Sequence, residues 1–467
     1  MGSVGKGSST PGLVPTSSTP SRFVDGTSSS SRSRSRIAMD GEEMGEEASY
    51  APENSGSAVF DGGSDGPRTI KMIVTMPPYL DLGGFADHHG WDGVNAYLDM
   101  ARRGLEIELD LASKLLPHPN EQVKRLGSLM VCENDDVSRL RREYDRLVGT
   151  GRVRCEWRDR DDVANIHGRD ANFGAGIWMP DDARIDSTAY ARALLDAASN
   201  MGGAVTVVED CSPMTSVETM INANDHVDND DDDENEDDHR RSHHAEVRLE
   251  DGRVLRARHV IVATGGMHLD ANLAGLMTPR YSYLVALPHP RRRRSTTTPA
   301  GGDGGGMEYP DSPNFFTLGF SHDWCVESDF VRISGEDHFS GLKRPRSDER
   351  CRNLAEWGRR KYPYIDPGAS YPSRHGVYSE TADFLPLVGT TSASRRVCYM
   401  VGCNAWGQAS LSAVASWAPA LLGYRDYRPD EVEGARLCSI GRFVGREVSG
   451  SARATRRSRT MNARSRL

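Results

Sequence analysis

A loop with two glycines, between a predicted strand and a predicted helix, offers the clearest chemistry in this sequence. The strand covers residues 397–401, and the polar or small loop residues that follow are Gly402, Asn404, Trp406, Gly407 and Gln408. Apolar residues then recur at helical spacing as far as residue 421. The amino end of such a helix carries partial positive charge and backbone N–H donors, which stabilise negative charge on a bound ring. We expect a flavin here, with a corner that serves packing alone as the alternative.

A second glycine pair follows another predicted strand. The run 259–264 reads HVIVAT and is followed by Gly265 and Gly266. A continuous apolar run predicts a strand buried on both faces. Glycines at its carboxyl end let the backbone approach a cofactor closely, so Ala263, Thr264 and Gly265 are candidate binding residues. The motif alone fits an ordinary core strand and turn equally well.

Two amphipathic helices precede these strands. The first is expected from Val94 to Leu116, with Asp92 at its start and Pro117 at its end. The second begins after Asp186 and is expected to bury one face and to stop at two glycines, with these inward residues: Tyr190, Leu194, Leu195 and Ala198.

Strands are expected between that helix and the glycine pair. The run 204–210 reads as a strand, and Asp251-Gly252 between two alternating runs predicts a hairpin. Helix, strand, hairpin and buried strand in this order indicate an α/β fold.

Charged and low-complexity segments lie apart from these elements. The net charge is −10, much of it from the acidic run 225–238, whereas arginines cluster at 291–294 and at 453–466. We interpret these as solvated loops and flexible arms, with no nucleic-acid partner. The sequence contains no apolar stretch long enough to cross a bilayer and no Cys-x-x-Cys pair of the kind that binds metals. We therefore expect neither a membrane partner nor a bound metal.

Four landmarks in order resemble the D-amino-acid oxidase superfamily, which includes sarcosine, glycine and pipecolate oxidases. They are LGGFADHHGW from Leu82, the helix-bearing run IWMPDDARIDSTAYARALLDAASNMGGAV, the strand HVIVATGG, and the closing pair ETADFLPLVG and GCNAWGQ. The resemblance covers about Leu82 to Tyr427. It implies a glutathione-reductase-like FAD-binding half, interleaved with a mixed-sheet substrate domain.

The resemblance also implies domain bounds and an activity. We expect the FAD-binding half at 69–123, 181–275 and 370–427, the substrate domain at 124–180 and 276–369, a disordered leader at 1–68 and a basic tail at 428–467. In that family the flavin takes a hydride from a carbon that bears an amine, and dioxygen reoxidises it to give hydrogen peroxide. The expected partner is therefore a small amine or amino acid.

Site residues follow from the matched motifs. Gly83 and Gly84 would lie near the flavin, and residues 263–265 near its diphosphate side. Asp383 and Gly389 would brace the closing loop. Polar residues of the predicted substrate sheet are candidates for substrate contact or catalysis: Tyr281, Tyr283, Arg332, His338 and Tyr378. Arg332 could clamp a carboxylate through a bidentate pair, whereas tyrosines and histidines at such positions are more often structural.

The sequence departs from the family in three places. No Gly-x-Gly-x-x-Gly motif follows a strand before Leu82, where the chain reads IKMIVTMPPYL. A cysteine that links flavin covalently in sarcosine-oxidase relatives is replaced by Gly376-Val377, so FAD is expected to bind non-covalently. A carboxylate-holding lysine is replaced by Gln408-Ala409. The missing glycine motif leaves open a cofactor-free remnant that acts as a scaffold or binding protein, and a dehydrogenase with another electron acceptor is a further alternative.

The final tripeptide suggests a compartment. Ser465, Arg466 and Leu467 resemble the peroxisomal address Ser-Lys-Leu, which would make the peroxisomal import receptor a partner. The cytoplasm, or another organelle reached through the Ser/Arg-rich leader, is the alternative.

Overall fold

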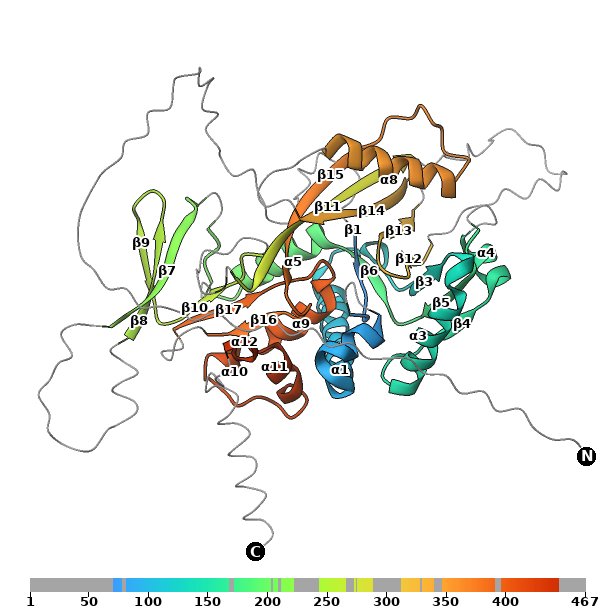
Figure 1. Ribbon diagram of the computed structural model, residues 1–467. Coiled ribbons are helices and arrows are strands. Elements are labelled where there is room, and N and C mark those ends of the chain that lie inside the picture. The colour runs from blue at the N-terminus through green and yellow to red at the C-terminus, as the bar shows by residue number, and fades with distance from the viewer. Residues whose placement is uncertain are drawn as a thin grey trace, which may run out of the picture. The chain divides into compact units, whose positions relative to one another are not determined.

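The computed structural model describes residues 70–77, 81–167, 172–202, 205–208, 211–221, 243–265, 273, 275–288, 312–327, 330–339, 347–390 and 396–444 (Figure 1). The leader, the acidic run 225–238, the arginines at 291–294 and the final tripeptide lie outside these residues. Helices and strands alternate through the described part, and the predicted α/β fold with mixed sheets is confirmed.

An eight-stranded sheet is the largest element of the fold. Its order is β15-β11-β14-β13-β12-β3-β5-β4, and only β12 and β3 run parallel. The strands are β3 (Ser128–Cys132), β4 (Glu156–Arg158), β5 (Ala175–Met179), β11 (Met277–Pro288), β12 (Asn314–Thr317), β13 (His322–Val326), β14 (Phe330–Phe339) and β15 (Ser373–Thr381). β15 pairs with β11 from end to end, so it belongs to this sheet, whereas the sequence predicts it in the FAD-binding half.

The two faces of this sheet bury different residues. Side chains alternate along a strand, so Phe315 and Phe316 point to opposite faces. Phe315 packs under α8 (Ser347–Lys361), together with residues of α4 (Arg160–His167). Phe316 packs toward α1 (Leu82–Leu115) and α3 (Val137–Thr150). The face of each strand residue can therefore be assigned from its neighbours.

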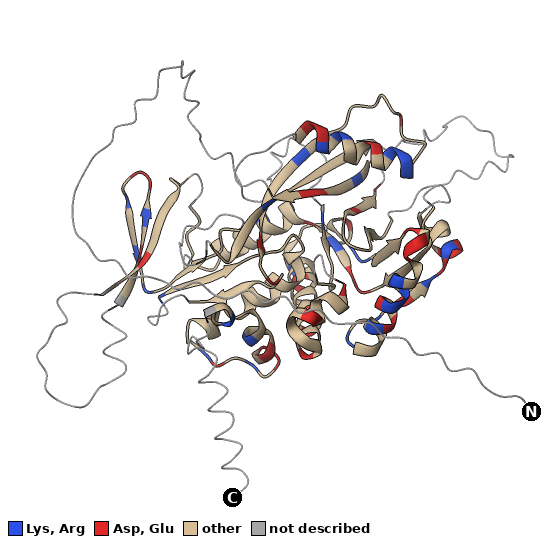
Figure 2. Ribbon diagram, viewed as in Figure 1, with Lys and Arg blue, Asp and Glu red and all other residues tan. Residues whose placement is uncertain are grey.

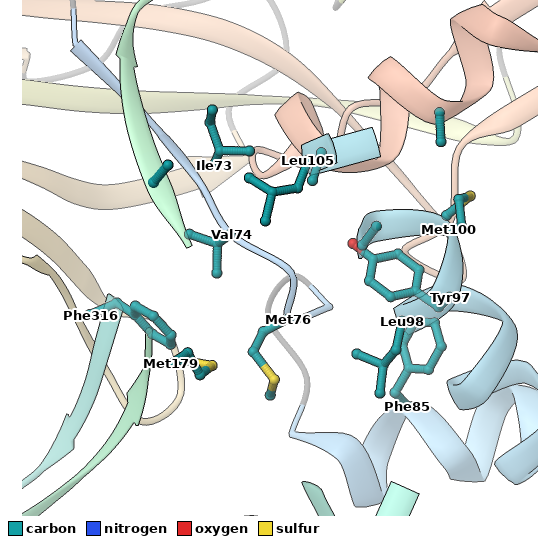
Figure 3. Packing of buried hydrophobic residues seen from close by; sticks show 14 of the residues in the cluster. Ile73, Val74, Met76, Phe85, Tyr97, Leu98, Met100, Leu105, Met179 and Phe316 are labelled. Atoms are coloured by element: carbon teal, nitrogen blue, oxygen red, sulfur yellow. The ribbon is translucent and has the colours of Figure 1, made fainter. Parts of the chain in front are cut away.

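A small antiparallel sheet lies between the large sheet and α1. β6 (Ala183–Asp186) pairs with β1 (Ile70–Ile73) and with β2 (Val123–Lys124), which follows the short α2 (Pro119–Gln122). Figure 3 shows Ile73, Val74 and Met76 between Phe316 of the large sheet and Leu98 of α1. Residues 73–76 of this segment thus lie in the core of the described fold.

A three-stranded sheet carries both predicted glycine motifs. Its order is β10 (Val260–Val262), β17 (Val397–Val401) and β16 (Leu387–Gly389), with β10 and β17 parallel. Among the described strands, β10 pairs with β17 alone, and Ile261 is 39% exposed. The expectation that this strand is buried on both faces is therefore wrong, because Val262 is buried at 4% exposure whereas the face that carries Ile261 is open.

The remaining elements complete the chain. A hairpin of β8 (His243–Leu249) and β9 (Val254–Ala257), joined by β7 (Met214–Ile221), confirms the predicted turn, where Gly252 has φ +86°. The other helices are α5 (Ser187–Ser199), α9 (Gly407–Ser416), α10 (Ala418–Leu421), α11 (Val432–Cys438) and α12 (Gly441–Val444), with a 3-10 turn at Asn134–Asp136.

Three local predictions need correction. α1 begins at Leu82, capped by Asp81 and kinked at Gly90, and not near Asp92. Its glycines weaken the helical signal, although the chain is helical there. Residues 205–208 form no strand, and Val208 is 66% exposed. The second helix is confirmed at α5, but Leu195 is 44% exposed and does not face inward.

The predicted tail is also shorter than expected. Residues 432–444 form α11 and α12, and Ala435 and Cys438 are buried against α1 and its neighbours. Arg442 donates to both oxygens of Asp383, at 2.6 and 2.9 Å. This part of the chain is therefore folded.

No helix among the residues described is both long and apolar enough to span a bilayer. Within the same residues, no group of three or more histidine, cysteine or acidic side chains is arranged to hold a metal ion.

Candidate active site

The glycine loop after β17 is a tight corner. Gly402 has φ +82°, and a Cβ there would lie 2.6 Å from the methyl group of Thr381. A Cβ on Gly407 would lie 2.7 Å from Cβ of Cys403. Contacts under 3.0 Å cannot be relieved without moving the chain, so both glycines are required for this corner to close.

Asn404 holds the corner to the end of β15. It is 1% exposed, and its Oδ1 accepts hydrogen bonds from the backbone N–H of Thr381 at 2.8 Å and from its hydroxyl at 3.1 Å. Its Nδ2 donates to the carbonyl of Gly402 at 2.9 Å. The Asn404 side chain is occupied by hydrogen bonds within the protein, so only its backbone is left for the predicted contact with a ring.

α9 begins directly after this corner with a free positive end. No side chain caps the helix, so its first backbone N–H groups are not satisfied by a capping residue. Figure 2 shows no charged residue in α9, β16 or β17. The field at the helix start is therefore not offset by a charge within these elements, and an electron-rich ring atom would be stabilised there.

α9 is held against α1 at very short range. A Cβ on Gly104 would lie 1.7 Å from the carbonyl oxygen of Ala409, so only glycine permits this crossing. One turn further along α1, Glu108 is 0% exposed and its Oε2 accepts a hydrogen bond from Ser412 at 3.2 Å. Burial raises the pKa of Glu108 to about 7. The position of the glycine loop thus depends on a tightly packed and partly polar helix contact.

The end of β10 offers exposed backbone. Ala263, Thr264 and Gly265 are exposed, and no atom lies within 4 Å of a Cβ built on Gly265, which has φ +64°. The carbonyl of Gly265 accepts a hydrogen bond from Ser379 at 3.2 Å, and the backbone N–H of Asn404 donates to the carbonyl of Ser379 at 3.0 Å. The two predicted glycine motifs are therefore brought together through the end of β15.

The glycine loop also touches the large sheet. The ring of Trp406 lies edge-on to Phe316 at 4.8 Å and to Phe320 at 4.7 Å between ring centroids. Because Phe316 marks one face of the sheet, this is the face next to the loop. Part of the surface of Trp406, which is predicted beside the flavin ring, therefore packs against these two phenylalanines.

Two predicted polar residues lie on that face. Arg332 pairs across the strands with Cys325 and is 5% exposed, and its Nε donates to Glu327 at 3.0 Å. The Tyr378 hydroxyl donates to Asp337 at 2.7 Å. The proposed carboxylate clamp at Arg332 is thus already engaged with an acidic residue of the chain.

Acidic residues on the same face are absent from the sequence prediction. Asp323 is the cross-strand partner of Phe316 and of Ser334, whose hydroxyl donates to its Oδ1 at 2.5 Å. Glu380 pairs with Arg280 at 2.5 Å. Strand alternation relative to Phe316 would have placed Asp323 on this face, but the sequence does not reveal which face meets the loop.

Tyr281, Tyr283 and His338 lie on the opposite face. Both tyrosines belong to the core under α8, with exposed fractions of 4% and 0%. His338 stacks between their rings and its Nε2 is 2.9 Å from the Tyr283 hydroxyl. Burial lowers the pKa of His338 below its usual value. Their predicted position at a substrate cavity is corrected, because alternation places them away from the glycine loop.

The remaining predicted residues support the structure around the corner. Gly83 lies against the guanidinium of Arg146, where a Cβ would come within 2.3 Å of a nitrogen, and the N–H of Gly84 donates to Asp81. The guanidinium is the far end of a flexible side chain that can move aside, so this contact alone does not require a glycine at position 83. Gly389 pairs with Tyr399 in the sheet, and Asp383 is held by Arg442.

These residues fit the ring end of an FAD molecule. The uncapped, uncharged start of α9 suits a ring that gains negative charge, and the exposed end of β10 suits a phosphate-bearing chain. Residues 402–408 would lie beside the ring and residues 263–265 along the diphosphate side. No strand-to-helix Gly-x-Gly-x-x-Gly turn occurs in the described ranges.

Several solved structures share the fold of this chain. A glycine oxidase from Geobacillus kaustophilus superposes with a TM-score of 0.52 at 16% identity, covering 71% of this chain and 80% of that one. An iminodiacetate oxidase from Chelativorans sp. BNC1 gives 0.52 at 16% identity, covering 72% and 82%. An FAD-bound L-alpha-glycerophosphate oxidase from Mycoplasma pneumoniae gives 0.52 at 13% identity, covering 78% and 86%.

At these identities the solved structures show a shared fold only. No curated protein sequence matches the chain. The profile of the FAD dependent oxidoreductase family (DAO) matches residues 82–420, which include the glycine loop, the end of β10 and the large sheet. The chain therefore belongs to the FAD dependent oxidoreductase family.

Proposed function

We propose that this protein oxidises the C–N bond of an amino acid or secondary amine, with non-covalently bound FAD as hydride acceptor and dioxygen as the final oxidant, which yields hydrogen peroxide. The observation that carries the proposal is the contact of Trp406 with Phe316, because it brings the glycine loop onto a polar sheet face. Two structural neighbours are oxidases of glycine and of iminodiacetate, whose substrates both contain a C–N bond.

The chain's own residues would orient the substrate and keep water away. Hydride transfer requires the substrate carbon to lie over the ring, within about 3.5 Å of its acceptor atom. The face with Arg332 and Tyr378 supplies charged and hydroxyl groups that could hold polar substrate groups there. Phe316, Phe320 and Trp406 form an apolar cluster where the glycine loop meets this face. FAD supplies the two-electron redox chemistry when it is bound.

Substrate screening of the FAD-loaded full chain tests this proposal. Glycine, sarcosine, D-proline and pipecolate should be added under exclusion of oxygen, while loss of flavin absorbance near 450 nm is followed. We expect at least one to bleach the flavin, and admission of air to restore the colour with one hydrogen peroxide per substrate oxidised. Restoration by an artificial carrier and not by air would replace oxidase with dehydrogenase. No bleaching by any amine, combined with bleaching by glycerol 3-phosphate, would contradict C–N oxidation.

A peroxisomal location completes the proposal. It rests on the tripeptide Ser465, Arg466 and Leu467, and a peroxide-forming oxidase is suited to that compartment. A fluorescent fusion that leaves this carboxyl end free should co-localise with peroxisomes, and deletion of the tripeptide should abolish this. A punctate pattern that survives the deletion would contradict the assignment.

A further inference from the structure

We propose that Asp323 accepts the proton that a substrate ammonium group must lose before its C–N bond is oxidised. This inference rests on the proposed function and names a residue for it. Asp323 would therefore select amines over alcohols of similar shape.

Strand register places Asp323 near the glycine loop. It is the cross-strand partner of Phe316, whose ring touches Trp406 of the glycine loop at 4.8 Å between centroids. Cross-strand partners point to the same face of a sheet, so the Asp323 carboxylate lies on the face that meets the loop.

The contacts of Asp323 leave its carboxylate basic. Its hydrogen bond comes from the neutral Ser334 hydroxyl at 2.5 Å, and among the described residues it forms no ion pair. Arg332 and Arg280, on the same face, are instead matched by Glu327 and Glu380. Asp323 is therefore an acidic side chain of this face whose charge an incoming ammonium could balance.

The charged groups around Asp323 set its proton affinity. Burial raises the pKa of Asp323 to about 6, the Ser334 hydrogen bond lowers it, nearby Asp337 raises it and Lys71 lowers it. Cys325, on the same face of β13, has its pKa raised to about 11 by burial and is protonated near neutral pH. At pH 7 to 8 the carboxylate is ionised and yet more basic than an exposed aspartate, as an acceptor requires.

The proton balance of the reaction explains why such an acceptor is needed. In an ammonium group the nitrogen lone pair is held in an N–H bond, so it cannot form the second C–N bond. Transfer of that proton to the Asp323 carboxylate frees the lone pair, which then forms the C=N bond. The hydrogen on carbon leaves with its electron pair to the acceptor that FAD supplies. The products are an iminium ion, which water hydrolyses, and a protonated Asp323.

A pH titration of the absorbance of bound FAD tests the location and the acidity. Wild type should show a spectral shift with its midpoint near pH 6, because a charge is created next to the ring. D323N should lose this shift. S334A should move the midpoint to higher pH, since it removes the donor that favours the charged form. The matched control D348N, on exposed α8 over the opposite face, should titrate like wild type. An unchanged titration in D323N would overturn the proposal.

Amine binding tests the role as proton acceptor. Methylammonium chloride, added at pH 8, should perturb the bound FAD spectrum of wild type and bind at least about tenfold more weakly to D323N. Tetramethylammonium, which has the charge but no N–H group, should bind both alike. Equal methylammonium binding by the two proteins would refute the role of Asp323 alone. Failure of wild type to take up FAD would instead refute the proposed function.

Discussion

Replacement of Glu108 by glutamine should make the protein more stable at pH 8 and leave its stability near pH 4.5 almost unchanged. Glu108 is fully buried between α1 and α9, one oxygen accepts from Ser412, and Oε1 has no hydrogen-bond partner among the described residues. Burial raises its pKa from 4.5 to about 7. Above pH 7 the folded protein therefore contains a poorly compensated buried charge.

The size and sign of the effect follow from proton linkage. Between pH 4.5 and 7 the folded state binds more protons at Glu108 than the unfolded state does, so the free energy of unfolding falls as pH rises. Each tenfold change in proton affinity is worth about 1.4 kcal/mol, which gives an upper limit of about 3.5 kcal/mol above pH 7. E108Q is isosteric and uncharged, so it should recover most of this.

Urea denaturation followed by tryptophan fluorescence at pH 4.5, 6 and 8 measures the difference. The gap between E108Q and wild type should grow with pH and level off above pH 7. E106Q, at an exposed position of the same helix where Glu106 forms surface ion pairs, should shift the midpoint little at any pH. A gap that does not vary with pH, or a variant less stable than wild type at pH 8, would refute the buried-charge reasoning.

Three substitutions test the supports of the glycine loop. G104A should strongly destabilise the fold and weaken FAD uptake, because the added methyl group would meet the carbonyl oxygen of Ala409 in α9. The control G149A lies at an open site in α3 and should gain up to about 1 kcal/mol of stability. Equal melting temperatures for the two variants would contradict this prediction. N404A should cost about 2 to 4 kcal/mol, because it leaves the buried N–H of Thr381 and the carbonyl of Gly402 without their side-chain partner, and calorimetry that finds no loss would show that Asn404 does not hold the corner to β15. R442M should cost about 3 kcal/mol or more by leaving Asp383 unpaired, so a fully stable variant would show that the last helices do not brace the corner.

Local patterns predicted the elements whose signals are local. The hairpin at Asp251-Gly252, the capped start of α5 after Asp186, and the strand and helix on either side of the glycine loop all follow from residue spacing and turn chemistry. These features depend on neighbours within a few positions, which the sequence displays directly.

The errors arise where tertiary contacts decide. Tyr281 and Tyr283 alternate correctly, but alternation does not say which face meets the loop. Asn404 reads as a binding residue because it is polar in a glycine loop, yet three hydrogen bonds within the protein occupy its side chain. Arg442 lies in a basic stretch that resembles a tail, although a pairing with Asp383, distant in sequence, folds it into the body of the protein.

The chain lacks the Gly-x-Gly-x-x-Gly motif, and the strand β10 near the expected diphosphate side is partly exposed. In the described sheet β10 is an edge strand, and its central Ile261 is 39% exposed although the run is apolar. We expect FAD affinity to depend mainly on the corner at 402–408.

Uptake of FAD by the purified full chain tests whether this protein binds a flavin. Protein mixed with excess FAD and freed of unbound cofactor should be yellow, with absorbance near 450 nm that corresponds to about one FAD per chain and a perturbed flavin spectrum. Acid should release the FAD intact, as expected for non-covalent binding. A colourless, folded protein that quenches no FAD fluorescence would show that the chain binds no FAD. It would then favour the alternative of a cofactor-free remnant that acts as a scaffold or binding protein.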